Sequence, residues 1–386
     1  MKNVGIVTFY TAINYGVHLQ AFALQEAVSQ MGYESVIVNY PHHKANIEKD
    51  GILKRLFSKL KKINRLASPD GIKRFLYMRK FRNSEAELEK KKSFQLFTNT
   101  RFRLTPRCES MQDVIEKTEG CSSFICGSDQ IWNPNYTECN PVFFLQFAPK
   151  NTRIAYAPSV GVSSIPKELS GKYKEFLDGF LHISARESTG ASLISNLTGH
   201  KCLTVVDPTL LHDTEFWNHL SSDQVRGEEY VLIYFLGFSP LHKKVIDRLK
   251  TLTSIKIVNI PICYETASDK SFEQVHASIA QFLSLIRDAK FVLTDSFHGV
   301  AFSVNYRKNF YAVSRNDTKY SLNSRIADFL NKISLNDRVI YNDNVSDYKM
   351  SEIDYSETDE LLCSWVNESK EYLSSSLAEA TKNVYD

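Results

Sequence analysis

No part of the sequence predicts a membrane span or a targeting segment. Its 386 residues contain no run of 18 apolar side chains, the length that a membrane-spanning helix needs. The first residues, MKNVGIVTFYTAINYG, carry one lysine and a short apolar stretch broken by polar side chains, which is not typical of a signal peptide. We therefore expect a cytoplasmic protein.

Several motifs that would fix a reaction class are also missing. The seven cysteines are odd in number and none are spaced as C-x-x-C, so neither a zinc site nor a disulfide framework is predicted. There is no H-x-x-x-H or D-x-D motif, and we expect no metal site. The sequence contains no G-x-G-x-x-G motif, no P-loop and no G-x-S-x-G motif. It therefore does not support a dinucleotide fingerprint, a nucleoside triphosphatase or a nucleophile elbow, in that order.

The amino-acid composition is typical of a folded globular chain. Hydrophobic residues make up 43% of the sequence and charged residues 24%, which excludes disordered and collagen-like classes. At roughly 100–200 residues per domain, the length predicts two domains, each large enough to bury its own core.

Positive charge is concentrated in one segment. The net charge of the whole chain is only +3, but residues 52–107 hold 17 Lys and Arg against 4 Asp and Glu, a balance of +13. Such a concentration favours an anionic partner. The other interpretation is a pair of helices whose Lys and Arg side chains simply face water.

The first forty residues follow the pattern of a strand, a helix and a second strand. Residues 4–7 form a short apolar strand, and apolar side chains then recur at alternating spacings of four and three over 17–31. Residues 35–39 follow as a second strand. Because the crossover in such a unit is right-handed, the two strands should lie parallel in one sheet.

Two α/β series are predicted along the chain. The first spans 1–198 and is interrupted at about 52–107 by the basic segment, which we expect to be helical. The second spans 199–350 and begins with a strand at 203–206. A final helical region, 351–386, should pack back over the domain junction. The fold class is therefore α/β with two Rossmann-like domains, and such domains bind their ligand in the cleft between them.

Candidate binding residues follow directly after predicted strands, where helix amino ends present free N–H groups. Asn14 and Gly16 allow the backbone to approach an anion, although Asn and Gly are also common in plain turns. A later loop carries the polar and aromatic residues Ser128, Asp129, Gln130 and Trp132. There Asp129 is a candidate base or hydroxyl acceptor and Trp132 a candidate platform for a sugar ring. Alternatively, Ser128 or Asp129 only caps a turn.

Cationic and titratable side chains follow three further strands. Arg186 suits bidentate binding of a phosphate or carboxylate, unless it forms a structural ion pair. Ser296 is a candidate N-cap, and His298 lies in the first turn of the same helix, where a bound anion would let it give or take a proton. A satisfied polar residue at a helix start is the other interpretation of this histidine. Arg315 and Lys319 lie in a polar loop that could reach the same anion.

Five motifs, in their order and spacing, resemble the polysaccharide pyruvyl transferase family, in its subgroup with Gly-Ser-Asp-Gln-Ile-Trp. The motifs are GIVTFYTAINYG followed by LQAFALQ at 5–25, FICGSDQIWNP at 124–134, ISARESTG at 183–190, VVDPTLL at 205–211 and TDSFHGVAFSVNYRKNF at 294–310. The likeness covers residues 3 to about 345. It implies two Rossmann-like domains in a GT-B-like arrangement, with the ligand cleft between them.

The resemblance also implies an activity. Members of the family transfer the enolpyruvyl unit of phosphoenolpyruvate to a sugar, forming a cyclic pyruvate ketal and releasing phosphate. Arg186, His298 and Lys319 match positions that bind phosphoenolpyruvate in the family. His298 is our candidate general acid, and Asp129 our candidate for orienting or deprotonating the acceptor hydroxyl. We expect no cofactor, with phosphoenolpyruvate as the donor substrate. His18 departs from the aliphatic residue usual in relatives, and its place relative to the site stays open.

The resemblance gives the basic segment a use. Acceptors in this family are usually hexoses or N-acetylhexosamines on a growing glycan or a lipid diphosphate. Attraction of about 1 kcal/mol per Lys or Arg near an anionic membrane would hold the protein peripherally beside them. No nucleic acid partner is expected. Two alternatives stay open: a GT-B glycosyltransferase that uses a nucleotide sugar, and an inactive anion-binding scaffold of a glycan assembly complex.

Overall fold

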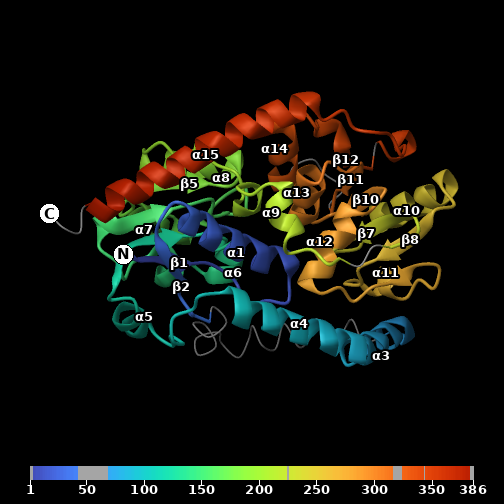
Figure 1. The fold of residues 1–386 in the computed structure, drawn as a ribbon, viewed down its shortest axis with the longest axis horizontal. Coiled ribbons are helices and arrows are strands. Elements are labelled where there is room, and N and C mark those ends of the chain that lie inside the picture. The colour runs from blue at the N-terminus through green and yellow to red at the C-terminus, as the bar shows by residue number, and fades with distance from the viewer. Residues whose placement is uncertain (1–2, 42–67, 224–225, 316–323, 343, 383–386) are drawn as a thin grey trace.

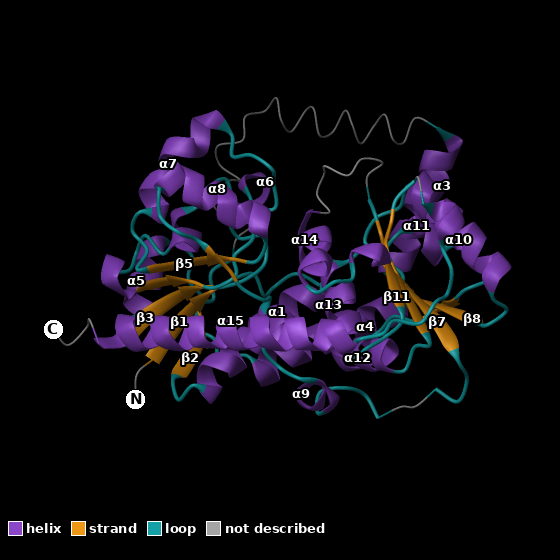
Figure 2. Ribbon diagram, turned by 90° about the horizontal axis from the view of Figure 1, so that it is seen from above, coloured by secondary structure: helices purple, strands orange, loops and turns teal. Residues whose placement is uncertain are grey.

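The computed structural model describes residues 3–41, 68–223, 226–315, 324–342 and 344–382. Within them the chain forms two α/β domains, each built on a six-stranded parallel sheet with helices on both faces (Figure 1, Figure 2). No helix among these residues is both long enough and apolar enough to cross a membrane.

The first sheet has the strand order β2-β1-β3-β4-β5-β6. Its strands are β1 Asn3–Val7, β2 Glu34–Ile37, β3 Cys121–Cys126, β4 Arg153–Ala155, β5 His182–Ala185 and β6 Leu203–Thr204. The predicted parallel pairing of the first two strands is confirmed, because Gly5 lies opposite Val36 and Ile6 opposite Ile37. The carboxyl ends of all six strands therefore meet at one edge.

The helices of this domain are α1 Tyr15–Gln30, α5 Met111–Lys117, α6 Pro134–Thr137, α7 Lys167–Leu177 and α8 Ser188–Thr198. The side chain of Asn14 caps α1 by accepting hydrogen bonds from two backbone N–H groups of its first turn, at 2.9 and 3.4 Å. Because α1 lies between its own sheet and the second domain, 13 of its 16 residues are buried. At that junction Tyr15 stacks on Phe282 with 4.2 Å between ring centroids, and its hydroxyl donates to the carbonyl of Ala277 at 2.7 Å.

The second sheet has the order β12-β11-β10-β7-β8-β9, again with every pair parallel. Its strands are β7 Tyr230–Tyr234, β8 Lys256–Asn259, β9 Glu273–Gln274, β10 Phe291–Thr294, β11 Phe310–Val313 and β12 Val339–Ile340. Its helices are α9 Thr214–Asn218, α10 Pro240–Leu252, α11 Tyr264–Ala267, α12 Ile279–Arg287, α13 Phe297–Asn305 and α14 Ser324–Lys332. Buried β10 runs almost directly into α13, so the start of this helix lies at the carboxyl edge of the sheet.

The boundary expected at residue 198 is wrong. The strand near residue 203, predicted to open the second domain, is β6, which pairs with β5 and ends the first sheet. Only two of its residues join the ladder, so its own sequence does not show which sheet it completes. Asp207, which follows this strand, consequently lies at the carboxyl edge of the first sheet.

The described part of the basic segment forms two helices, α3 Pro69–Arg82 and α4 Glu85–Arg101, while residues 42–67 lie outside the described chain. Both helices run along the lower edge of the molecule in Figure 1 and reach the second domain. Arg74 forms an ion pair with Glu265 on α11, and Glu87 on α4 pairs with His276 at 2.9 Å. Helices α3 and α4 therefore form a strap that joins the two domains.

The carboxyl-terminal helix α15 (Ser356–Lys382) also crosses between the domains, along the opposite edge in Figure 1. Near its start, the hydroxyl of Thr358 donates to the carbonyl of Ile333 in the second domain at 3.0 Å. Farther along, the hydroxyl of Tyr372 donates to the carbonyl of Ala155 in the first domain, also at 3.0 Å. Helix α15 and the strap thus hold the domains together from two sides.

Candidate functional site

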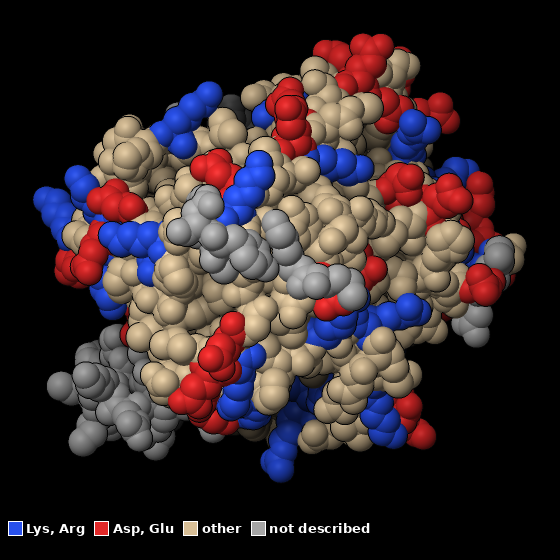
Figure 3. All heavy atoms as spheres, turned by 60° about the vertical axis from the view of Figure 1, so that its left-hand side comes forward, with Lys and Arg blue, Asp and Glu red and all other residues tan. Residues whose placement is uncertain are grey.

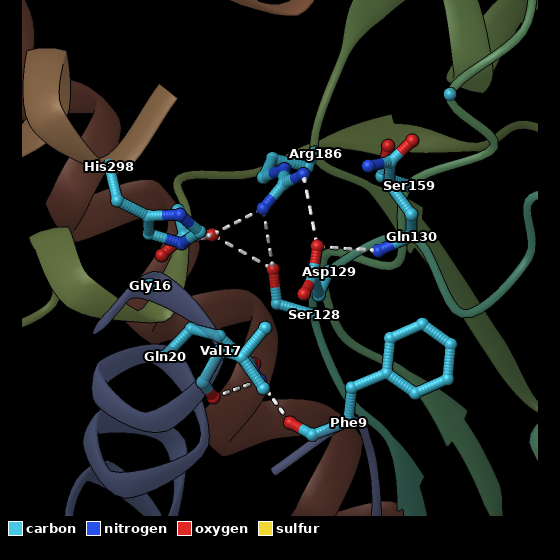
Figure 4. Close-up of polar contacts among 12 residues, drawn as sticks. Phe9, Gly16, Val17, Gln20, Ser128, Asp129, Gln130, Ser159, Arg186 and His298 are labelled. Carbon is cyan, nitrogen blue, oxygen red and sulfur yellow. Dashed lines mark hydrogen bonds and ion pairs between the residues drawn. The ribbon is translucent and has the colours of Figure 1, made fainter. Parts of the chain in front are cut away.

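Four strand ends converge where the two domains meet (Figure 4). The loops after β3, β5 and β6 carry Ser128, Arg186 and Asp207 from the first domain. His298 comes from the second domain, in the first turn of α13. Three of these four residues were predicted at strand ends from the sequence, and the structure brings them together around the fourth.

Asp207 is the centre of this network. Its Oδ2 atom accepts hydrogen bonds from the hydroxyl of Ser128 at 2.9 Å and from Nη1 of Arg186 at 2.8 Å, and it lies 3.6 Å from Nε2 of His298. Its Oδ1 atom accepts from the backbone N–H and the hydroxyl of Thr209 at 3.0 and 2.8 Å. Burial alone would raise the pKa of Asp207, but His298 and Arg186 hold it well below its ordinary value. The carboxylate therefore stays ionised, and its Oδ2 atom holds the guanidinium of Arg186 beside the ring of His298.

Arg186 lies just beneath the surface of the site. Its guanidinium stacks 4.5 Å from the ring of Phe297, and its Nη2 atom lies 3.9 Å from Oδ1 of Asp129. Burial lowers the pKa of Arg186, but the carboxylates of Asp207 and Asp129 more than reverse this and raise it. The structural ion pair left open by the sequence is thus present, with Asp207 as the partner, while Nε and Nη2 have no hydrogen-bond partner within the described chain.

A pocket opens beside this network, between the domains. Six residues predicted from the sequence line it: Asn14, Asp129, Gln130, Ser296, His298 and Arg315. The first three come from the first domain and the last three from the second, so the pocket exists only when the domains are together. Among the described residues, no group of three or more His, Cys, Asp or Glu side chains is arranged to hold a metal ion.

Gly16 and Ser296 set the position of His298. The hydroxyl of Ser296 caps α13 by accepting from the N–H of Gly299 at 3.3 Å, which places His298 in the first turn of the helix. Across the domain junction, a β-carbon on Gly16 would lie 2.0 Å from Nδ1 of His298. Only a residue without a side chain fits at this point, so the glycine allows the imidazole to reach the network.

The backbone around Asp129 aims its carboxylate at the pocket. Asp129 has a φ of 71°, in the left-handed region that few residues other than glycine adopt. Its Oδ1 atom accepts from the N–H of Gln130 at 2.8 Å, and its carbonyl accepts from the N–H of Ser159 at 2.7 Å. Oδ2 has no hydrogen-bond partner among the described residues, which leaves it available to a ligand hydroxyl.

Two further arginines face the pocket. Arg315 is held by Asp295, which accepts from its Nε atom at 2.8 Å through the carboxylate and from Nη2 at 2.9 Å through the carbonyl. Arg325 lines the same pocket but forms no ion pair or hydrogen bond within the described chain. Burial, together with Arg186 and Arg315, lowers the pKa of Arg325 to about 10, so it stays a cation at neutral pH.

Three residues of this site were not predicted from the sequence: Asp207, Asp295 and Arg325. The two aspartates stand in the motifs VVDPTLL and TDSFHG, directly after strands, and their position at sheet edges was the signal that could have found them. Arg325 follows no strand and carries no motif. Only the packing of α14 against the other elements brings it to the pocket.

Two predicted residues do not take part as expected. Trp132 is not a platform for a sugar, because its side chain is fully buried, stacks on Phe144 and donates through Nε1 to the carbonyl of Phe143 at 3.0 Å. Ser128 is buried beneath the pocket and acts on Asp207 rather than lining the wall. Lys319 lies outside the described residues.

His18 does not line the pocket. It is buried between α1 and α4, with Nδ1 3.3 Å from the carbonyl of Asn14 and Nε2 3.2 Å from the hydroxyl oxygen of Thr98. Its ring also stacks on Phe102 with 5.9 Å between centroids. His18 therefore joins the strap to the first domain.

A model of the polysaccharide pyruvyl transferase family matches residues 14–317. The chain belongs to this family. The matched residues include Asn14, Asp129, Arg186, Asp207 and His298, so the family match and the site lie in the same part of the chain. A comparison with curated proteins returns no match.

Solved structures similar to this chain have low sequence identity to it. S. aureus MnaA, in a co-structure with UDP, has a TM-score of 0.50 and 13% identity over 90% of this chain and 87% of the other. A protein described as a UDP-N-acetylglucosamine 2-epimerase from Listeria monocytogenes has a TM-score of 0.46 and 10% identity over 97% of this chain and 90% of the other. The spinosyn rhamnosyltransferase SpnG has a TM-score of 0.40 and 10% identity over 100% of this chain and 96% of the other. With the two parallel sheets, the MnaA likeness confirms the predicted fold class, two Rossmann-like domains in a GT-B-like arrangement.

Proposed function

We propose that this protein transfers the enolpyruvyl unit of phosphoenolpyruvate to two hydroxyls of a hexose or N-acetylhexosamine. The acceptor belongs to a cell-surface glycan or its lipid-diphosphate precursor, and the product is a cyclic pyruvate ketal. The bond between C2 and the phosphate oxygen breaks, two bonds from sugar oxygens to C2 form, and phosphate leaves. One acceptor proton ends on the methylene carbon, which becomes a methyl group, and the other ends on phosphate.

The proposal rests on one observation: His298 and Asp129 line the same pocket, together with two arginines. His298 and Asp129 come from opposite domains. An acid that protonates the donor and a carboxylate that accepts from the sugar hydroxyl are the two groups that this addition needs. A donor bound between them would meet both at once.

The cations of the pocket are assigned to the two anionic groups of the donor. The charge of Arg315 is offset by Asp295, whereas Arg325 has no ion-pair partner within the described chain. Arg325 is therefore the cation with most attraction left for a phosphate or carboxylate. The amino end of α13 adds backbone N–H groups and a positive dipole end beside His298.

His298 is assigned as the general acid that protonates the methylene carbon. Asp207, 3.6 Å from Nε2, and Gly16, packed against Nδ1, fix the orientation of the ring. Arg186 shares Asp207 with His298, so it supports the ring through that carboxylate. We retain Arg186 as a donor-binding residue through its Nε and Nη2 atoms, which have no partner among the described residues.

The deciding experiment measures phosphate release from phosphoenolpyruvate with a panel of nitrophenyl hexosides and lipid-linked sugars. We expect release that depends on an acceptor, and a fall of about 10²–10⁴-fold for His298→Gln and for Asp129→Asn. His219→Gln is the matched control, because His219 is an exposed histidine away from the pocket and its loss should leave the rate unchanged. Absence of release with every acceptor, or equal rates for wild type and His298→Gln, would contradict the proposal.

A second measurement separates the proposal from its alternatives. The MnaA structure contains UDP, and a helix amino end beside a pocket also suits a diphosphate. We expect phosphoenolpyruvate, and not UDP, to raise the melting temperature of this protein. A larger shift with UDP would favour a nucleotide-sugar glycosyltransferase. Full cellular function of His298→Gln would favour an inactive anion-binding scaffold.

A further inference from the structure

Helix α3 leaves a row of large apolar side chains exposed to solvent. Ile72, Phe75 and Leu76 are 47%, 45% and 55% exposed. With Arg79 they stand at positions i, i+3, i+4 and i+7, so they form one stripe along the helix. Apolar residues grouped in this way, rather than scattered singly, mark a surface that binds something.

Cations flank this stripe on both sides. Lys73, Arg79, Lys80 and Arg82 are all exposed, and none of them forms an ion pair with a described residue. The one acidic residue of α3, Asp70, lies in its first turn. The outer face of α3 thus combines positive charge with exposed apolar groups.

The opposite face of α3 is fixed to the second domain. Arg74 pairs with Glu265, and the hydroxyl of Tyr77 donates to the carbonyl of Ala267 at 2.5 Å. Phe81 packs against His276 with 5.0 Å between ring centroids. Because these contacts hold the opposite face of the helix against the second domain, the exposed apolar stripe points away from that domain.

We propose that this outer face, defined by Ile72, Lys73, Phe75, Leu76, Arg79 and Lys80, docks the protein on an anionic lipid bilayer. The three apolar side chains insert among the lipid headgroups and upper acyl chains, and the cations contact phosphate groups beside them. This is how a helix that lies in the membrane interface binds. The proposal concerns a surface outside the pocket and does not depend on the reaction proposed above.

The composition of the face favours a membrane over a protein partner. Protein interfaces are depleted of lysine at their centre, whereas interfacial helices combine Lys and Arg with Phe, Leu or Ile. Basic and acidic side chains are interspersed on the face drawn in Figure 3. Helix α3, by contrast, carries five Lys and Arg residues and a single acidic residue. An anionic surface of lipid is the occupant that matches both the charge and the apolar groups.

Vesicle sedimentation with the full chain tests the charge and the apolar stripe separately. We expect binding to vesicles with about 30% phosphatidylglycerol, and release by about 0.5 M salt. The triple change Lys73→Gln, Arg79→Gln and Lys80→Gln should weaken this binding by about tenfold or more. The apolar triple Ile72→Ser, Phe75→Ser and Leu76→Ser should weaken it by a similar factor.

The matched control removes three exposed lysines elsewhere: Lys167→Gln, Lys243→Gln and Lys244→Gln. It makes the same change in net charge and should bind as wild type does. Equal binding of the control and the α3 charge variant, or no binding of wild type to anionic vesicles, would overturn the proposal.

A fluorescent reporter tests whether α3 itself enters the lipid. The native tryptophans, Trp132, Trp217 and Trp365, are all buried, so Phe75→Trp adds an exposed reporter at the proposed contact. We expect its emission to shift to the blue and to be quenched by brominated lipids in anionic vesicles. Tyr136→Trp, at a residue that is 56% exposed on the first domain, is the control and should not respond. Equal responses at the two positions, or none at Phe75→Trp, would show that another surface binds.

Discussion

Gly16 of the first domain and His298 of the second are in such close contact that the imidazole occupies the space of a side chain on Gly16. A β-carbon there would lie 2.0 Å from Nδ1 and 2.4 Å from Cγ of the ring. The spacing of the two domains and the orientation of the proposed acid are therefore set by the same contact. A side chain added at Gly16 has to move the ring, the helix or the domain.

Gly16→Ala should lower acceptor-dependent phosphate release by at least about tenfold, since a displacement near 1 Å at a reacting group can cost 10²-fold. Overpacking should cost about 1–3 kcal/mol in the free energy of unfolding. Both are measured on purified protein, by phosphate release and by urea unfolding. Gly171→Ala on α7 is the control, because a β-carbon on Gly171 would meet no heavy atom within 4 Å beyond its chain neighbours and the nearby backbone of its own helix, so the variant should keep full activity. Full activity of Gly16→Ala would show that His298 does not need its present position.

Asp207→Asn should strongly destabilise the protein, because it leaves buried Arg186 without its partner at 2.8 Å. Removal of one member of a buried ion pair typically costs about 3–5 kcal/mol. Urea unfolding at neutral pH measures the loss. The control is Asp247→Asn, since Asp247 is 59% exposed in its pair with Lys243 and its loss should change stability by about 0.5 kcal/mol or less. Equal effects of the two changes would contradict the central role of Asp207.

The second domain shows which parts of the fold the sequence could predict. Residues 291–293 are apolar and Ser296 follows three residues later, so the sequence predicted a buried strand and a capped helix, and β10 and α13 form there. Strands β9 and β12 have two residues each, too few to show any periodicity. They form because longer neighbours offer them free backbone groups, which is a tertiary effect.

Some residues of the site could also be predicted from the sequence, and others could not. Asn14, Asp129 and His298 were predicted because each follows a strand, and parallel strands place such residues at the carboxyl edge of their own sheet. The direction of Trp132 was mispredicted, because the loop after β3 turns its side chain into the core. Arg325 was missed because its place in the pocket depends on how the domains and α14 pack, which no local pattern encodes.

Arg325→Gln should raise the KM for phosphoenolpyruvate by about 10–100-fold, because a hydrogen bond to a charged group is worth about 1.5–3 kcal/mol. The fold should be retained, since Arg325 has no partner to leave unpaired within the described chain. Steady-state kinetics at varied donor concentration measure the change. Arg307→Gln is the control, because this arginine is 66% exposed in its pair with Asp359 and should leave KM unchanged. An unchanged KM for Arg325→Gln would remove it from the donor site.

The pH dependence of stability should reveal the burial of His18. Burial lowers the pKa of His18 to about 4, whereas the unfolded chain has the ordinary value of 6.5. Between these values the unfolded state binds the proton and the folded state does not, so stability falls as pH falls. At about 1.4 kcal/mol per pKa unit, the loss from pH 6.5 to 4 approaches about 3 kcal/mol.

His18→Leu removes this proton-binding group and should flatten the fall in stability between pH 7 and pH 5, as followed by urea unfolding at each pH. Some slope will remain, because burial also lowers the pKa of His212. Exposed His219 supplies the control, since His219→Leu should keep the slope of wild type. If His18→Leu kept that slope as well, the imidazole would have to be accessible to protons in the folded state, and the strap would not be closed over α1 as the structure has it.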